Sequence, residues 1–133
     1  YKAEVVAPDS IFSLDVDIYA PCALGATLNT ENIGKLKCAI VSGAANNQLA
    51  DEVVHSKMLL DKGILWAPDF LINAGGLINV YSELKKFSRA EALKQTEHIY
   101  NVTLEIFKKS KAEKIPTLVA AMQMAEKRIY GGK

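Results

Sequence analysis

Three short apolar segments that alternate with helical patterns limit what this chain can fold into. They are residues 15–20, 37–42 and 64–67, and each is followed by a turn of small or polar residues. The last two are nearly continuously apolar, as are strands of a parallel sheet that is covered on both faces. Strands that alternate with helices imply right-handed crossovers. We therefore predict an α/β fold: half of a Rossmann-like doubly wound parallel sheet with about three to four strands, followed by C-terminal helices.

The helices expected between and after these strands are identified by their end signals. Asn46 or Asn47 is expected to cap the helix after the second strand, and Asn73 the helix after the third. Ser88, with Glu91 three residues later, forms a capping box for a long fourth helix. The expected helices cover residues 29–36, 48–62, 73–86, 89–112 and 116–130, and residues 70–72 are expected to extend the third strand.

Composition is that of an ordinary globular chain. Of the 133 residues, 50% are hydrophobic, 16 are basic and 15 are acidic. We expect a single domain over residues 1–133, with strands and crossover helices in 1–86 and C-terminal helices in 87–133. The nearly balanced net charge gives no electrostatic indication that the chain binds nucleic acid or an anionic membrane, and neither partner is expected. Cys22 and Cys38 lack metal-ligand spacing and are expected to be buried, reduced thiols of a cytoplasmic protein.

Small or polar turns follow all three expected strands. Ligands of open parallel sheets bind at the carboxyl ends of the strands, so these turns form the expected binding site. Gly75 and Gly76 leave the third turn without bulk, which allows a ligand to approach the backbone. The three turns are Cys22–Ala23, Gly43–Asn47 and Asn73–Gly76.

Two asparagines and one helix face are the strongest ligand-binding candidates. Asn46 and Asn73 carry primary amides, which both donate and accept hydrogen bonds and suit a carboxamide, a ribose hydroxyl or a carboxylate. Helix capping alone is the alternative role for each. Leu77 and Val80 are three residues apart, so on a helix they share one face that would contact an apolar part of a ligand.

No catalytic set and no metal site emerges from the sequence. The dinucleotide fingerprint G-x-G-x-x-G with its later acidic residue is not present, so we expect the diphosphate-binding half to be missing. His55 and His98 lie mid-helix beside charged residues and are expected at the surface. Asp15 and Asp17 would share one face of a strand. We favour the interpretation that these carboxylates are solvated at the sheet edge over the interpretation that they transfer protons.

Three motifs carry a resemblance to a known family. They are Asp17–Gly25 (DIYAPCALG), Gly43–Leu49 (GAANNQL) and Ala67–Val80 (APDFLINAGGLINV). In this order and spacing they resemble the glutamate/leucine/phenylalanine/valine dehydrogenase family, most closely its leucine-specific members. The resemblance covers nearly the whole chain, including the later helices.

The resemblance implies an NAD-dependent amino-acid dehydrogenase of the cytoplasm. The implied reaction is the reversible oxidative deamination of a branched-chain L-amino acid to its 2-oxo acid and ammonia, with hydride passing to nicotinamide. The residue that separates NAD from NADP lies outside the matching segment. The full-length protein is expected to be a homo-oligomer.

The resemblance also assigns roles to individual residues. Leu77 and Val80 match positions that line the pocket for the substrate side chain. Glutamate-specific members carry a hydroxyl residue where Val80 stands, and an apolar side chain cannot pair with a γ-carboxylate, whose unpaired burial is costly. Leu77 is bulky and argues against a large aromatic substrate, so a branched aliphatic one is favoured. The residues implied to line the cofactor are Cys22, Ala23, Gly43, Ala44, Asn46 and Asn73.

The family's catalytic lysines and aspartate and its glycine-rich loop have no match here, and the chain starts at Tyr1 rather than Met. We therefore expect a fragment: the C-terminal portion of an NAD(P)-binding domain, inactive by itself, whose partner is the missing N-terminal catalytic domain. One alternative is a glutamate, valine or phenylalanine dehydrogenase of the same family. Another is a non-catalytic interaction module that retained the half-fold. A hydroxy-acid dehydrogenase of similar fold would require a catalytic His near the third strand, which the sequence lacks.

Overall fold

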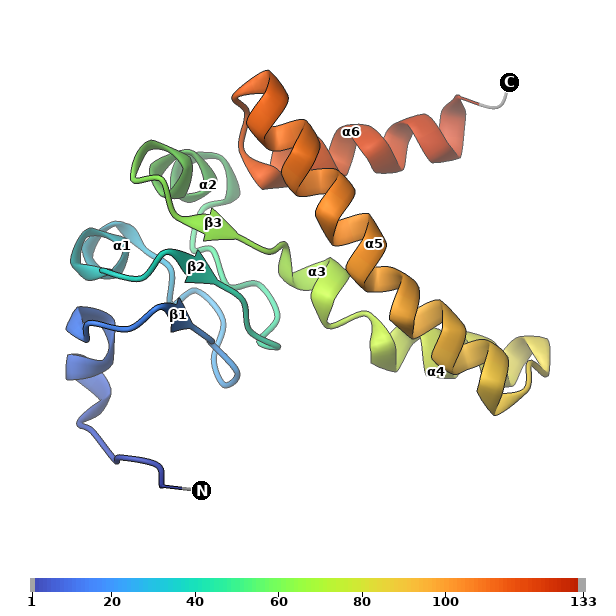
Figure 1. The fold of residues 1–133 in the computed structure, drawn as a ribbon, viewed down its shortest axis with the longest axis horizontal. Coiled ribbons are helices and arrows are strands. Elements are labelled where there is room, and N and C mark those ends of the chain that lie inside the picture. Colours follow the sequence, from blue (N-terminus) through green and yellow to red (C-terminus); the bar gives the residue numbers. More distant parts are fainter. Residues whose placement is uncertain (1, 132–133) are drawn as a thin grey trace.

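A three-stranded parallel sheet forms the centre of the structure, a computed structural model that describes residues 2–131 (Figure 1). The strands β1 (Ile18–Tyr19), β2 (Ile40–Val41) and β3 (Leu65–Trp66) lie side by side in chain order. Ile18 pairs with Ile40, and Ile40 pairs with Leu65. The predicted parallel sheet of α/β class is confirmed, although each strand is shorter than its apolar segment.

Two crossover helices cover the sheet. They are α1 (Thr30–Lys35) and α2 (Glu52–Asp61), which pack against each other. Asn29 caps α1, because its Oδ1 accepts the backbone N–H of Asn32 at 2.9 Å. The main core lies between these helices and the sheet, and it is made of Tyr19, Leu28, Ile33, Leu36, Cys38, Val41, Leu49, Leu59, Ile64, Trp66 and Leu118.

The prediction that Asn46 or Asn47 caps α2 is wrong. The cap is Asp51, whose Oδ1 accepts the backbone N–H of Val54 at 2.8 Å. The helix begins later than expected because tertiary contacts hold residues 48–50 outside it. Leu49 forms an isolated parallel β-bridge with Leu28, and the side chain of Gln48 is fully buried. These tertiary contacts outweigh the local helix signals.

The segment after β3 also departs from the prediction. Residues 70–72 do not extend the strand but belong to a single helical turn, α3 (Asp69–Ile72). Asn73 ends this turn, and Ala74 is already helical before α4 (Gly75–Lys85) begins. Because an N-cap needs extended backbone and neither residue has it, Asn73 is not a helix N-cap.

Three C-terminal helices extend away from the sheet. They are α4, α5 (Arg89–Glu113) and α6 (Thr117–Tyr130), and both α4 and α6 pack against α5. The predicted capping box is confirmed: the Ser88 backbone N–H donates to Glu91 Oε2 at 2.7 Å, and the Glu91 N–H donates to Ser88 Oγ. A second core cluster lies where α5 and α6 meet and includes Ile106, Ala120 and Ala121.

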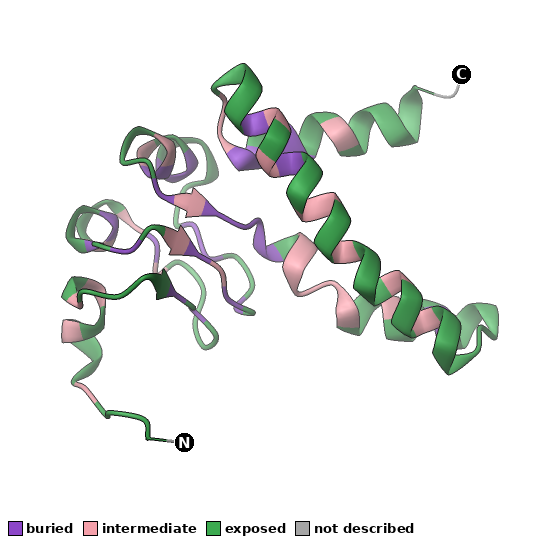
Figure 2. Ribbon diagram, in the orientation of Figure 1, coloured by how far each residue is buried: buried purple, intermediate pink, exposed green. Residues whose placement is uncertain are grey.

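Much of α5 is uncovered within the described chain. Only Ile106 and Ser110 are buried along its length, while Leu93 and Tyr100 are exposed. Figure 2 shows this as a mostly green helix that runs beyond the purple core. The helix is longer than the part of the fold it contacts. No helix in residues 2–131 combines the length and apolarity needed to cross a bilayer.

Candidate functional site

The turns that follow the three strands meet at one edge of the sheet, which we call the carboxyl rim: Cys22–Ala23, Gly43–Asn47 and Asn73–Gly76. The first two turns are joined by the Ala45 N–H, which donates to the Pro21 carbonyl at 2.9 Å. The Ala26 N–H also donates to the Asn47 carbonyl at 2.7 Å. Parallel strands place their carboxyl ends at the same edge; in Figure 1 the first two turns follow the tips of the β1 and β2 arrows, and the third follows α3, which comes after β3.

Asn46 and Asn73 are brought into direct contact. Asn73 Nδ2 donates to Asn46 Oδ1 at 2.5 Å and lies 3.4 Å from the Ala44 carbonyl oxygen. Asn46 is exposed and Asn73 is half-buried. Among the contacts of residues 2–131, Asn73 Oδ1 and Asn46 Nδ2 have no hydrogen-bond partner. The pair therefore offers one acceptor and one donor, which is the complement of a carboxamide.

Gly43 lets two of the turns approach closely. A Cβ atom at this position would lie 2.1 Å from the Pro21 carbonyl oxygen and 2.4 Å from the Pro21 nitrogen. No heavier residue fits without moving backbone atoms. Gly43 thus sets the separation between the turn after β1 and the turn after β2.

The two cysteines differ in environment. Cys38 is buried in the core as predicted, but Cys22 is exposed, so the prediction of a buried thiol is wrong there. The chain turns outward at Pro21 and carries Cys22 to the carboxyl rim, where its Sγ lies 3.4 Å from the Ala44 backbone N. Ala23 and Ala44 are also exposed at this edge.

Leu77 and Val80 lie on α4, whose first two residues, Gly75 and Gly76, belong to the rim. Leu77 is 73% exposed and Val80 is 54% exposed. Two large apolar side chains are therefore presented on one helix face that the described residues leave uncovered. Leu77 directly follows Gly76, the last residue of the rim.

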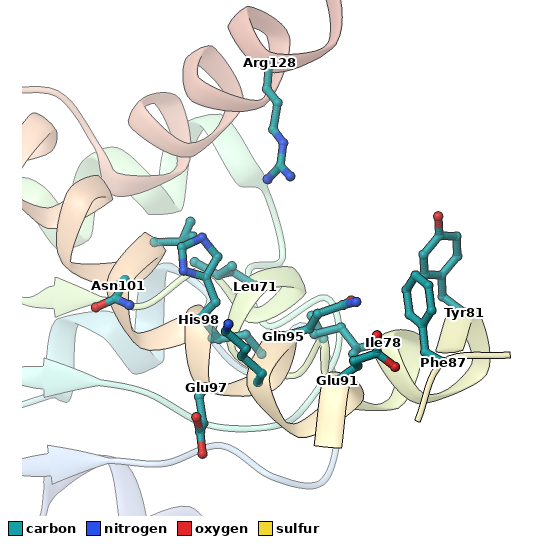
Figure 3. A pocket seen from close by; sticks show the side chains of 14 residues that line it. Leu71, Ile78, Tyr81, Phe87, Glu91, Gln95, Glu97, His98, Asn101 and Arg128 are labelled. Atoms are coloured by element: carbon teal, nitrogen blue, oxygen red, sulfur yellow. The ribbon is translucent and has the colours of Figure 1, made fainter. Parts of the chain in front are cut away.

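A groove formed by the described residues lies elsewhere on the molecule. It has a volume of about 920 Å³ and lies between α4, α5 and α6. Figure 3 shows Arg128 pointing from α6 toward α5, with His98 and Leu71 near one end and Tyr81 and Phe87 at the other. None of the residues predicted to bind cofactor or substrate lines this groove.

The titratable side chains singled out from the sequence do not form a catalytic set. His55 is buried, which corrects the surface prediction: its Nδ1 accepts the Asp51 N–H at 2.8 Å, and its Nε2 lies 3.1 Å from Thr30 Oγ1. His98 is exposed as expected, and so are Asp15 and Asp17. Within residues 2–131, no cluster of three or more His, Cys, Asp or Glu side chains could hold a metal ion.

Tyr19 lies on the edge strand β1, and its side chain is buried in the main core. Burial raises the pKa of its phenol above the ordinary value. The phenol therefore stays protonated at neutral pH and packs as a neutral core side chain against Phe12.

Sequence reasoning missed two polar residues beneath the rim, Gln48 and Asp69. Both are buried and both are hydrogen-bonded to the turn that contains Asn46 or to its neighbours. Their positions were the available signal. Gln48 follows the polar turn in the motif Gly43–Leu49, and Asp69 is a polar residue among apolar ones in the motif Ala67–Val80.

Comparison with known proteins connects this geometry to a family. Residues 1–131 match the family model described as "Glutamate/Leucine/Phenylalanine/Valine dehydrogenase". The leucine dehydrogenase of Thermoactinomyces intermedius is 52% identical over 97% of this chain and 35% of its own length. An L-tryptophan dehydrogenase of Nostoc punctiforme is 51% identical over 100% of this chain and 38% of its own length.

Solved structures agree with the sequence match. The crystal structure of L-tryptophan dehydrogenase from Nostoc punctiforme superposes with a TM-score of 0.93 at 52% identity, and it covers 97% of this chain and 39% of that one. The chain thus spans 35–38% of the length of the curated relatives described above. With half of its residues shared with these enzymes and a matching fold, the chain belongs to the glutamate/leucine/phenylalanine/valine dehydrogenase family.

Proposed function

We propose that the full-length protein that contains this chain is an NAD-dependent amino-acid dehydrogenase. Its reaction is the reversible oxidative deamination of a branched-chain L-amino acid to the 2-oxo acid and ammonia. The observation that carries this proposal is the pairing of Asn46 with Asn73 at the carboxyl rim, next to the uncovered apolar face of α4. A nicotinamide and an aliphatic side chain would be bound by adjacent surfaces.

The rim residues fit a bound nicotinamide ring. The free Asn73 oxygen and the free Asn46 amide group match the amide and carbonyl of a carboxamide. Cys22, Ala23 and Ala44 carry small side chains and are exposed at the rim, so the ring is able to approach the backbone there. When bound, the cofactor supplies the acceptor for the hydride that leaves the substrate α-carbon.

The chain's own residues have binding and orienting roles in this proposal. Leu77 and Val80 exclude water from the substrate side chain, and the two asparagines hold the ring in one orientation. The rim supplies amides and a thiol rather than an acid–base pair, so we assign proton transfer to residues outside this chain. This chain by itself is expected to be inactive.

An aromatic amino acid is the second candidate substrate. The observation in its favour is the Nostoc punctiforme L-tryptophan dehydrogenase, which is about as similar to this chain as the leucine dehydrogenase is. The branched-chain proposal is preferred because Leu77 fills space that a large ring would need next to Val80.

A substrate panel tests both candidates. The full-length protein is assayed with NAD or NADP and with leucine, valine, isoleucine, phenylalanine, tryptophan and glutamate, and formation of reduced cofactor is measured. We expect the highest kcat/KM with a branched-chain amino acid and NAD. Preference for tryptophan or phenylalanine supports the second candidate, and no turnover with any amino acid contradicts the proposed function.

Alkylation of Cys22 provides an independent test of the cofactor position. Cys22 is exposed at the rim, whereas Cys38 is 4% exposed, so iodoacetamide is expected to label Cys22 and spare Cys38 in the folded protein. NAD at roughly ten times its Kd should slow the labelling of Cys22 about tenfold, because only the free form reacts. Peptide mass spectrometry measures both sites, and Cys38 labelled in urea serves as the control. Equal Cys22 rates with and without NAD would contradict its placement beside the cofactor.

A further inference from the structure

Gln48 is a fully buried polar side chain directly beneath the rim. Its Nε2 donates to the carbonyls of Gly43 at 2.6 Å and Ala45 at 3.0 Å. Its Oε1 accepts the indole N–H of Trp66 at 3.0 Å. The reverse orientation of the amide would place its oxygen against two carbonyls and its NH₂ against an N–H. Every strong hydrogen-bonding group of this side chain is therefore satisfied in one orientation alone.

Asp69 continues this network into the third turn. Its Oδ2 accepts the backbone N–H of Gln48 at 2.8 Å, and its Oδ1 accepts the backbone N–H of Phe70 at 2.7 Å. The side chain is buried at the start of α3, the helical turn that ends at Asn73. One carboxylate thus connects the turn that carries Asn46 to the helical turn that carries Asn73.

The exposed pair itself is too weak to hold the two turns together. Asn46 is in contact with solvent, where exchange with water leaves a single hydrogen bond with only a small net contribution. The bonds of Gln48 and Asp69 are buried, and breaking one of them would leave an unpaired polar group in the interior. The buried bonds of Gln48 and Asp69 therefore hold the turns after β2 and β3 together more firmly than the exposed asparagine pair does.

We propose that Gln48 and Asp69, together with the Trp66 indole, are positioning residues for the cofactor. They hold the turns after β2 and β3 in the register in which Asn46 and Asn73 meet, so that the amides are arranged before the ligand arrives. This inference rests on the proposed NAD-binding function. It assigns no contact between these three side chains and the cofactor.

The test is Gln48→Glu in the full-length protein, since a carboxylate retains the acceptor for Trp66 but has no hydrogen to donate to Gly43 and Ala45. We expect the KM for NAD to rise about 10- to 100-fold, the scale of loss that a displaced binding group produces, with a smaller change in kcat at saturating NAD. Relative to the wild type, the rate of hydrogen–deuterium exchange should increase more in residues 43–47 and 69–74 than in α1. Trp66→Phe removes one hydrogen bond and retains an aromatic ring, and it serves as a milder variant with the same direction of change.

Leu59→Ala is the matched control, because Leu59 is a buried core residue of α2 that is not part of the rim or of the Gln48–Asp69 hydrogen-bond network. It is expected to reduce thermal stability without changing the KM for NAD. If the wild-type protein binds NAD and the KM of both rim variants equals that of Leu59→Ala, the positioning role is overturned and the proposed function stands. If the wild-type protein binds no nicotinamide cofactor, both are overturned.

Discussion

Gly43→Ala is expected to abolish measurable NAD binding by the full-length protein and to destabilise its fold. The added Cβ would lie 2.1 Å from the Pro21 carbonyl oxygen, far inside van der Waals contact. The clash cannot be relieved cheaply, because the Pro21 carbonyl accepts the Ala45 N–H and the Gly43 carbonyl accepts Gln48 Nε2. We expect a loss of about 3 kcal/mol in the free energy of unfolding, the upper part of the usual range for overpacking. Thermal unfolding and a fluorescence titration with NADH measure the two effects.

Gly34→Ala is the control for this substitution. Gly34 lies within α1, and a Cβ there meets no atom within 4 Å. Alanine stabilises a helix interior relative to glycine by roughly 0.5–1 kcal/mol, so this variant should be as stable as the parent or more so, with unchanged NAD affinity. If Gly43→Ala binds NADH as tightly as Gly34→Ala does, the rim is not the cofactor site.

The parallel sheet could be predicted because its signal is local. Short apolar runs such as residues 37–42 and 64–67, separated by a helical pattern, leave few topologies for the chain. Once the strands are parallel, their carboxyl ends share an edge, and the meeting of the three turns follows. The capping box at Ser88 was equally predictable, since its two hydrogen bonds join residues three apart.

The role of Asn73 could not be predicted because its partners are distant in the sequence. Asn73, which lies two residues before Gly75 and Gly76, suits a helix start by its local sequence, but its hydrogen-bond partner in the structure, Asn46, lies 27 positions earlier. The same holds for His55, whose burial depends on Thr30 of α1, 25 residues before it. Local signals cannot anticipate a hydrogen bond between two turns that only the folded chain brings together.

The start of α2 and the roles of Gln48 and Asp69 were missed for a related reason. Gln48 looked like the first residue of a helix because a capping residue precedes it and acidic residues follow. In the structure its backbone and side chain bond to Asp69, Trp66 and the turn at Gly43, which holds residues 48–50 out of the helix. Buried polar networks join several segments at once, so no single window of the sequence contains them.

Val80→Ser in the full-length protein is expected to reduce kcat/KM for leucine about 10- to 100-fold. The change removes two methyl groups from the face of α4 that we propose lies against the substrate side chain. A difference of one methylene group in an apolar pocket changes kcat/KM between substrates by roughly 10- to 200-fold. The KM for NAD should stay the same, because Val80 lies seven residues, roughly two helical turns, beyond Asn73. Turnover of amino acids with polar side chains should rise relative to leucine, since the hydroxyl gives them a hydrogen-bond partner.

Val53→Ser separates this effect from the general cost of exchanging an exposed valine. Val53 is 79% exposed on α2, Val80 is 54% exposed on α4, and both sit within helices. Both variants should keep the free energy of unfolding within about 0.5 kcal/mol of the parent, as surface substitutions usually do. A loss of leucine turnover confined to Val80→Ser then reports contact with the substrate. If kcat/KM for leucine is the same in both variants, the apolar face of α4 lies away from the substrate, and the branched-chain preference loses its physical basis.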